Sequence, residues 1–172
     1  MIIRKLYEDD LSIRVKWMND PRIYSSMHYQ IPITLENTLE WYKGNIDRND
    51  RTDLVLCTSE NPSQILAFAG IVSIDNEVKK AETYLFVNPE LLGKCIGTMA
   101  KSKLIEYAFN TLNLHKLYVI TNEDNYASIR IQEKFGYKLE GRLRQEYKSN
   151  EGILKDRLYY GLLKSDWQNA TY

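Results

Sequence analysis

Apolar and polar positions alternate along this 172-residue chain with a period that changes repeatedly between strand-like and helix-like. Expected strands cover residues 2–6, 54–57, 65–74, 82–88, 115–121, 137–147 and 153–163. Expected helices cover residues 11–18, 34–46, 100–112 and 126–135, and residues 22–33 form an irregular aromatic stretch. The order strand–helix–strand over 82–121 requires a parallel pair joined by a right-handed crossover. The pattern therefore predicts an α/β (α+β) protein with a mixed, mostly antiparallel, twisted sheet.

Two of the expected helices have a distinct apolar face. Thr34 is a suitable N-cap for the helix over 34–46. The residues expected on the buried face of that helix are Leu35, Leu39, Tyr42 and Ile46. In the helix over 100–112, apolar residues recur at four-residue spacing, so Lys101 and Lys103 are expected on the outside. Gly136 is placed where a glycine commonly ends a helix.

The most informative segment is Asn88-Pro89-Glu90-Leu91-Leu92-Gly93-Lys94-Cys95-Ile96-Gly97-Thr98. It follows an expected strand and leads into an expected helix. The first N–H groups of a helix have no partner inside it, and the helix dipole makes that end partly positive. A phosphate group fits such a turn, and Lys94 adds a cation. The alternative is an ordinary strand-to-helix turn.

Two common phosphate-binding motifs are excluded. A Walker loop needs a Gly-Lys-Ser or Gly-Lys-Thr sequence, which does not occur in the chain. The dinucleotide fingerprint needs three glycines in the spacing G-x-G-x-x-G, whereas this turn has only Gly93 and Gly97.

The turn resembles the acyl-coenzyme A loop of the GNAT superfamily of N-acyltransferases, Arg/Gln-x-x-Gly-x-Gly/Ala. Gly97 matches the last position, while Leu92 and Cys95 depart from the other two. The segment 125–141, with its Asn-x-x-Ser and Glu-Lys-x-Gly-Tyr sequences, also resembles this family, particularly its RimJ/RimL branch. Further features of that branch are Trp17-Met18-Asn19-Asp20-Pro21, Asp156 and Tyr159-Tyr160. The resemblance covers residues 2–167 and implies one GNAT-like domain, residues 1–172, with helices on both faces of the sheet and a central parallel pair that splays apart.

The resemblance implies that acetyl-CoA is the co-substrate. Its pyrophosphate would bind main-chain amides of the turn, and its pantetheine arm would run along the strand at 85–87. The residues expected to bind the coenzyme are Phe86, Val87, Leu92, Gly93, Lys94, Cys95, Ile96, Gly97, Thr98 and Asn125. Because a non-glycine residue pays about 1 kcal/mol or more for a positive φ angle, Cys95 is expected to avoid one.

Acyl transfer from a thioester to a primary amine requires that the amine is in its neutral, deprotonated form. Deprotonating an alkyl ammonium at pH 7 costs roughly 4 kcal/mol, so a carboxylate base helps. The resemblance assigns this role to Glu82, with a solvated charge at a strand end as the alternative. Ser128 is the candidate acid for the leaving thiolate, because Gln132 occupies the position where many family members have a tyrosine. Tyr84 and Tyr159 are alternative acids. Residues expected to bind the acceptor are Tyr24, Met27, His28, Tyr29, Tyr84 and Tyr159.

The charge balance and the cysteine content of the chain limit the classes of partner that it is expected to bind. Lys plus Arg equals Asp plus Glu at 23 each, so no net field favours nucleic acid or an acidic membrane surface. Cys57 and Cys95 are too few for a disulfide framework or a metal cluster, and no metal is expected. The N-terminal residues carry charges where a signal peptide would be apolar. Cytoplasmic location is the expectation.

Three hypotheses about function follow. The first is acetyl transfer to the primary amine of a small molecule, such as a nucleotide-linked amino sugar. The second is acetylation of a protein N-terminus, so the acceptor is a small-molecule or a peptide amine. The third is a non-catalytic acyl-CoA-binding module, motivated by the departures at Leu92, Cys95 and Gln132. The sequence leaves the oligomeric state undecided between a monomer and a homodimer.

Overall fold

The structure, a computed structural model, describes residues 1–27, 29–149 and 152–169, and its strands form a seven-stranded sheet. Its strands are β1 (Ile2–Lys5), β2 (Thr52–Cys57), β3 (Ile65–Asp75), β4 (Lys80–Val87), β5 (Lys116–Asn122), β6 (Lys138–Lys148) and β7 (Leu154–Leu163). Their order in the sheet is β1-β2-β3-β4-β5-β7-β6. The pair β4–β5 is parallel, while β1–β2, β2–β3, β5–β7 and β6–β7 are antiparallel. The predicted mixed, mostly antiparallel α/β fold is confirmed.

The helices agree with the expected ones except for two short additions. They are α1 (Leu11–Met18), α2 (Pro21–Tyr24), α3 (Leu35–Asn45), α4 (Ile96–Glu106), α5 (Tyr126–Lys134) and α6 (Lys164–Asn169). Helix α4 continues as a π-helical turn, Tyr107–Thr111. Helix α2 was missed because it is only four residues long; Asp20 caps it by accepting the N–H of Arg22 at 2.9 Å. The short helix α6 was also missed.

The chain divides into two compact units. Unit 1 comprises Met1–Ser73 and Tyr84–Leu104, and unit 2 comprises Ile74–Thr83 and Ile105–Tyr172. Strand β4 therefore contributes its first half to unit 2 and its second half to unit 1. The expectation of one domain over residues 1–172 stays a prediction.

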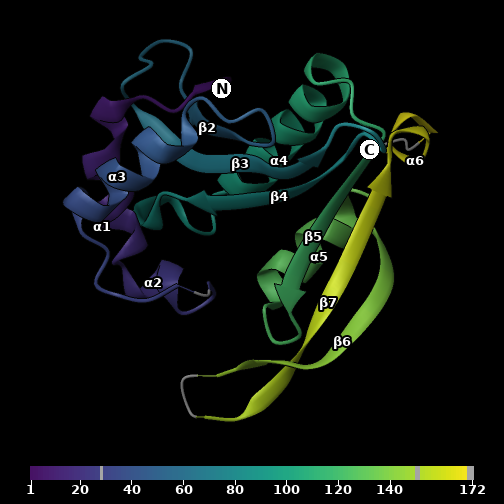
Figure 1. Cartoon of the computed structure of the whole chain (residues 1–172). Coiled ribbons are helices and arrows are strands. Elements are labelled where there is room, and N and C mark those ends of the chain that lie inside the picture. Colours follow the sequence, from purple (N-terminus) through teal and green to yellow (C-terminus); the bar gives the residue numbers. More distant parts are fainter. Residues whose placement is uncertain (28, 150–151, 170–172) are drawn as a thin grey trace. The chain divides into compact units, whose positions relative to one another are not determined.

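In unit 1, helices cover both faces of the sheet. Val55 and Phe68 belong to a buried cluster that includes residues of α1 and α2 and is contacted by α3. Their neighbours Leu54 and Ala67 point to the opposite face, because successive side chains of a strand alternate, and they are equally buried. Figure 1 shows α4 on the side of these strands opposite α3.

Two expectations about helix faces were wrong. Leu35 and Ile46 are 51% and 56% exposed, because they lie at the ends of α3, beyond the part that packs on the cluster. Lys101 is only 2% exposed rather than outside. Lys101 lies one helical turn before Ile105, which is fully buried. The buried face of α4 therefore includes Lys101 and Ile105 as well as Ala100. Lys103 is half-buried.

In unit 2, strand β5 pairs with β7 along its whole length, from Lys116 opposite Leu163 to Asn122 opposite Arg157. Helix α5 packs on the face that carries Tyr160, whose hydroxyl donates to the Glu133 carboxylate at 3.4 Å. Gly136 has a φ of 74° just after this helix, as predicted. Strands β6 and β7 form a long hairpin (Figure 1), and part of its expected turn, residues 150–151, lies outside the described residues.

Candidate functional site

The predicted phosphate-binding turn lies in unit 1 and is exposed from Leu92 to Cys95. Gly93 and Cys95 have φ angles of 78° and 61°. The expectation that Cys95 avoids a positive φ was therefore wrong: the main chain turns sharply enough here that a non-glycine residue takes the left-handed conformation. The carbonyl of Cys95 accepts the N–H of Met99 at 3.1 Å, so Cys95 precedes the first turn of α4.

This geometry fits an anionic ligand. Helix geometry leaves the N–H groups of Ile96, Gly97 and Thr98 without acceptors inside α4. The N–H of Lys94 is already used by the carbonyl of Leu91 at 3.3 Å, but its side chain is exposed. Three amides at the positive end of an 11-residue helix, with a nearby ammonium group, suit the pyrophosphate of a coenzyme.

Two of the expected coenzyme residues lie at the end of β4. The ring of Phe86 is buried against Phe68, with ring centroids 5.4 Å apart, so only the main chain of Phe86 remains for a ligand. Val87 is half-buried. The parallel register between β4 and β5 ends at Glu82 opposite Tyr118, although both strands continue beyond that point.

The aromatic stretch expected to bind the acceptor is partly structural. The hydroxyl of Tyr29 donates to the carbonyl of Met18 at 2.7 Å, and burial raises the pKa of Tyr29 to about 12. Met27 packs against the buried cluster of unit 1, while Tyr24 is half-buried. His28 lies outside the described residues.

Tyr84 is held inside unit 1. Its hydroxyl donates to Asp53 on β2 at 2.5 Å, and burial raises its pKa to about 12. The ring reaches β2 by crossing β3 at Gly70, where a Cβ atom would lie 2.0 Å from a ring carbon. Arg14, only 6% exposed, lies over the Tyr84 ring at 5.7 Å. No local pattern in the sequence indicates this network, because its members come from four distant segments.

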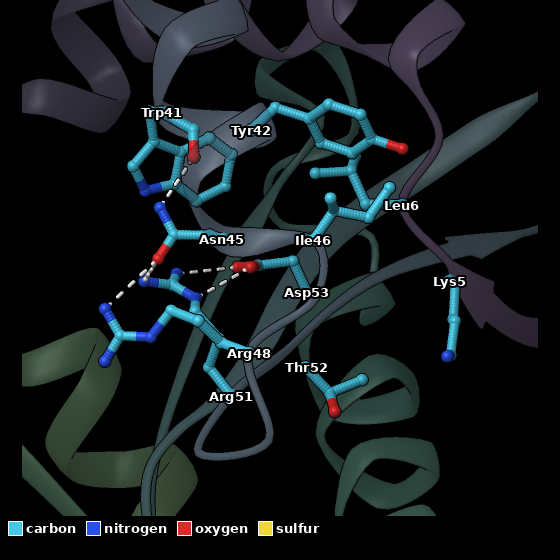
Figure 2. Close-up of a pocket in the computed structure, with 10 residues that line it drawn as sticks. All are labelled: Lys5, Leu6, Trp41, Tyr42, Asn45, Ile46, Arg48, Arg51, Thr52 and Asp53. Carbon is cyan, nitrogen blue, oxygen red and sulfur yellow. Dashed lines mark hydrogen bonds and ion pairs between the residues drawn. The ribbon is translucent and has the colours of Figure 1, made fainter.

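A pocket in unit 1 lies beside this network (Figure 2). It is lined by Lys5, Leu6, Trp41, Tyr42, Asn45, Ile46, Arg48, Arg51, Thr52 and Asp53. Arg51 makes two hydrogen bonds of 2.9 Å to Asp53, and Arg48 pairs with Asp50. Both guanidinium groups also donate to Oδ1 of Asn45. None of these residues was among the predicted site residues.

Glu82 lies in unit 2 on one face of the sheet. Because paired residues point to the same side, Glu82, Tyr118 and Tyr159 share this face. The rings of Tyr118 and Tyr159 stack with centroids 5.0 Å apart and planes inclined by 11°. The neighbours on the opposite face, such as Leu117 and Leu162, are fully buried. The face of Glu82 is thus the half-exposed side of this sheet.

The environment of Glu82 favours proton uptake. Burial raises the pKa of this carboxyl, and Arg157 on the same face opposes the rise. The pKa of Tyr159 is also raised, first by burial and then by the charges of Glu140 and Glu82. A half-buried carboxylate with a raised pKa is a better proton acceptor than an ordinary surface carboxylate.

The remaining candidates lie on α5. Asn125 caps this helix by accepting the N–H of Ser128 at 3.1 Å. Ser128 is half-buried, and its Oγ accepts a 3.4 Å hydrogen bond from Nε2 of Gln132. Gln132 is 5% exposed. The structure therefore brings Asn125 and Ser128 together, on the helix that covers the face opposite Glu82.

Within the described part of the chain, no group of three or more His, Cys, Asp or Glu side chains is placed to hold a metal ion. Over the same residues, no helix combines the length and apolarity needed to cross a membrane.

The sequence matches known proteins over most of its length. The family model for the acetyltransferase (GNAT) domain matches residues 1–138. A spermidine N(1)-acetyltransferase of Escherichia coli (strain K12) is 28% identical over 140 residues, which are 81% of this chain and 68% of the relative. YdaF of Bacillus subtilis (strain 168), provisionally named a ribosomal N-acetyltransferase, is 34% identical over 105 residues, 59% of this chain and 57% of the relative.

A solved structure shares the fold. The spermidine N-acetyltransferase from Vibrio cholerae, in complex with CoA and spermine, superposes with a TM-score of 0.89 at 24% identity, covering 98% of both chains. The match to the family model defines the class of this protein as an acetyltransferase. The chain belongs to the GNAT acetyltransferase family, and it is an acetyl-CoA-dependent N-acetyltransferase. Homodimer formation and cytoplasmic location stay predictions.

Proposed function

We propose that this enzyme transfers the acetyl group directly from acetyl-CoA to the primary amine of a small molecule, with Glu82 as the base. The observation that carries the proposal is the half-buried Glu82 carboxylate, with its raised pKa, at the last residue pair of the parallel register. The amine loses its proton to this carboxylate, directly or through water, and attacks the thioester carbon. The C–N bond forms, the C–S bond breaks, and the electron pair of that bond leaves on the coenzyme sulfur.

The coenzyme is assigned to main-chain groups. The pyrophosphate binds the amides of Ile96, Gly97 and Thr98 beside Lys94, and Gly93 provides the turn. Leu92 and Cys95 contribute backbone rather than side-chain contacts, so their departure from the family pattern weakens binding without abolishing it. The main chain of Phe86 and Val87, together with Asn125, is proposed to contact the pantetheine arm.

A nucleotide-linked amino sugar is the first acceptor hypothesis. The face that carries Glu82 also carries the stacked rings of Tyr118 and Tyr159 and the cation Arg157. Stacked aromatic rings suit a sugar ring, and a cation suits the phosphates of a nucleotide. Tyr24 and Met27, half-buried on unit 1, are further acceptor candidates.

A polyamine is the second hypothesis, because several relatives in the comparison, including those of Escherichia coli and Vibrio cholerae, carry the name spermidine N-acetyltransferase. A polycation needs several carboxylates. The Glu82 face carries a second one, Glu140, which is paired with Lys116 at 2.5 Å, and the cation Arg157 lies on the same face. Acetylation of a protein N-terminus stays a third possibility, in line with the name of YdaF.

A panel of acceptors tests these hypotheses. Thiol release from acetyl-CoA would be measured with an amino-sugar nucleotide, with spermidine and with a peptide that has a free N-terminus. We expect the highest kcat/KM for the amino-sugar nucleotide. A higher value for spermidine would transfer the assignment to polyamines. Tight acetyl-CoA binding without acceptor-dependent thiol release from any amine would support the non-catalytic module instead.

The role of Glu82 is tested by Glu82→Gln, which keeps the shape and removes the base. We expect kcat/KM to fall by about 10²-fold or more at pH 7. The loss should shrink toward pH 10, because an amine with a pKa near 10 then loses its proton unaided. Glu77→Gln, at an exposed position before β4, is the matched control. An unchanged pH–rate profile in Glu82→Gln would remove Glu82 as the base.

A further inference from the structure

The pocket of unit 1 (Figure 2) is lined by more cations than carboxylates. Its cations are Lys5, Arg48 and Arg51, and Asp53 is the one carboxylate among the described lining residues. Both oxygens of this carboxylate are engaged. Oδ2 accepts from Nε of Arg51, while Oδ1 accepts from Nη2 of Arg51 and from the hydroxyl of Tyr84. A cationic ligand would therefore meet a carboxylate that is already paired, whereas an anion would meet an excess of positive charge.

Two guanidinium groups converge in the wall of this pocket. Nη1 of Arg48 and Nη1 of Arg51 both donate to Oδ1 of Asn45, at 3.5 and 3.2 Å. The other edge of each guanidinium is held by a carboxylate, that of Arg48 by Asp50 and that of Arg51 by Asp53. Each Nη1 has two hydrogens and gives one of them to Asn45, so each keeps one that no described hydrogen bond uses. Two such donors close together can hold the two oxygens of a carboxylate.

A third guanidinium group lies behind the pocket wall. Arg14 is 6% exposed, and its Cζ atom lies 4.8 Å from the centre of the Trp41 ring, which lines the pocket. Nη1 of Arg14 has no hydrogen-bond partner among the described residues, and Nη2 donates to the hydroxyl of Tyr84 at 3.5 Å rather than to a carboxylate. Because solvent screens a buried charge only weakly, Arg14 adds to the positive potential of the pocket.

The rest of the lining is largely apolar. Four large apolar side chains contribute to it: Leu6, Trp41, Tyr42 and Ile46. Ile46 is 56% exposed, so a ligand with an apolar body would cover surface that water now contacts. An apolar wall beside a small number of polar groups that fix the orientation of a ligand is the usual design of a small-molecule site.

We propose that this pocket binds a small carboxylate with an aromatic or other apolar body. The carboxylate accepts hydrogen bonds from the guanidinium groups of Arg48 and Arg51, and the body packs against Leu6, Tyr42 and Ile46. Because hydrogen bonds to a charged acceptor are about twice as strong as neutral ones, the charge of the ligand decides its affinity. The pocket is separate from the residues assigned to acetyl transfer, so the inference goes beyond the proposed function and does not depend on it.

The test compares three probes of nearly the same size on the intact protein: phenylacetate, its neutral amide phenylacetamide, and the cation phenethylamine. Binding would be followed by NMR through the indole N–H signal of Trp41, which is identified by its absence in Trp41→Phe. We expect phenylacetate to shift this signal with a dissociation constant on the order of 1 mM, as is usual for so small a ligand. Phenylacetamide should bind about tenfold more weakly, and phenethylamine should bind no better than the amide.

Arg48→Gln tests the assigned donor. The side chain of Arg48 is 52% exposed, so its removal should leave the fold intact, as thermal unfolding would show. The affinity for phenylacetate should fall about tenfold in this variant, whereas that for phenylacetamide should change by less than about threefold. Lys43→Gln is the matched control, because Lys43 is an exposed cation on α3 outside the pocket lining. It should leave both affinities unchanged.

The comparison of the probes in the wild type decides the inference whether or not Arg48→Gln folds. Equal affinities for phenylacetate and phenylacetamide would overturn it, and so would tighter binding of phenethylamine or an unshifted Trp41 signal. An equal loss in Arg48→Gln and Lys43→Gln would also contradict it, since any cation would then serve. These outcomes differ from failure of the proposed function, which would appear as absent thiol release from acetyl-CoA with every amine.

Discussion

At the scale of single residues, the absence of a side chain at Gly70 decides how Tyr84 lies. A Cβ atom at this position would lie 2.0 and 2.5 Å from two ring carbons of Tyr84 and 2.8 Å from its hydroxyl oxygen. No real structure accepts such contacts, so the ring lies flat over β3 only because residue 70 is glycine. The hydroxyl can then reach Asp53, which is already paired with Arg51. Tyr84 is thereby committed to the interior of unit 1.

Gly70→Ala should therefore destabilise the protein by about 3 kcal/mol, the upper range for overpacking. The free energy of unfolding would be measured by urea denaturation. Gly44→Ala is the matched control: it lies in α3 with no atom within 4 Å of its Cβ position, and it should stabilise by about 1 kcal/mol. In a Tyr84→Ala background the cost of Gly70→Ala should largely disappear, and a cost that persists would contradict this account.

Cys95 shows the reverse case, a side chain where the main chain favours glycine. Its φ of 61° costs a non-glycine residue about 1 kcal/mol. Cys95→Gly should thus stabilise the protein by about 0.5–1 kcal/mol in thermal or urea unfolding, without weakening acetyl-CoA binding. A loss of stability would show that the thiol makes a compensating contact.

At the scale of elements, helix boundaries followed from local rules, while helix faces did not. Thr34 caps α3 and Asn125 caps α5, because a side-chain oxygen can satisfy a helix N–H within a few residues. The face of α4 depends on what packs against it. The burial of Ile105 agrees with its apolar character, whereas the burial of Lys101 one turn earlier could not be inferred from a pattern of apolar residues.

Burial of Lys101 lowers the pKa of its ammonium group to about 7. The usual lysine pKa is 10.5, so between about pH 7 and pH 10.5 the unfolded chain binds a proton that the folded chain has lost. The free energy of unfolding should therefore rise with pH over this window. Below about pH 7 both states are protonated and this contribution is constant.

Lys101→Met should remove that rise and stabilise the protein at pH 7, as measured by urea unfolding at several pH values. Lys43→Met, on the exposed side of α3, is the control and should keep the pH dependence of the wild type. A wild-type stability that is flat from pH 7 to pH 10 would contradict the assignment.

At the scale of the whole molecule, acidic and basic residues are equal in number, and several carboxylates have a nearby cationic partner. Hydrogen bonds from Arg22 hold the pKa of Asp20 at about 2. The pKa of Asp124 is lowered mainly by Lys155, and that of Asp156 by the main-chain N–H of Gln145 and by Arg142. These carboxylates are spread over both units, so their protonation affects the molecule as a whole.

The free energy of unfolding should fall as the pH drops from about 4 toward 2. In this range the unfolded carboxylates bind protons that the folded ones still exclude. Urea unfolding between pH 5 and pH 2 would measure the decline. Arg22→Gln should make the decline less steep, because Asp20 would then titrate closer to its ordinary pKa of 3.8. Equal slopes for both proteins would contradict the role of this pair.

The sequence by itself determined the order of the main elements, the parallel crossover and the tight turn before α4, because each of these depends on residues close together in the chain. It also marked Glu82, Asn125 and Ser128 as candidates, through a resemblance that later agreed with the family. Only the tertiary structure decided that Tyr84 is engaged by Asp53, that Lys101 is buried, and that Gln132 bonds to Ser128. These features depend on which side chains meet after the chain has folded, and composition and periodicity do not carry that information.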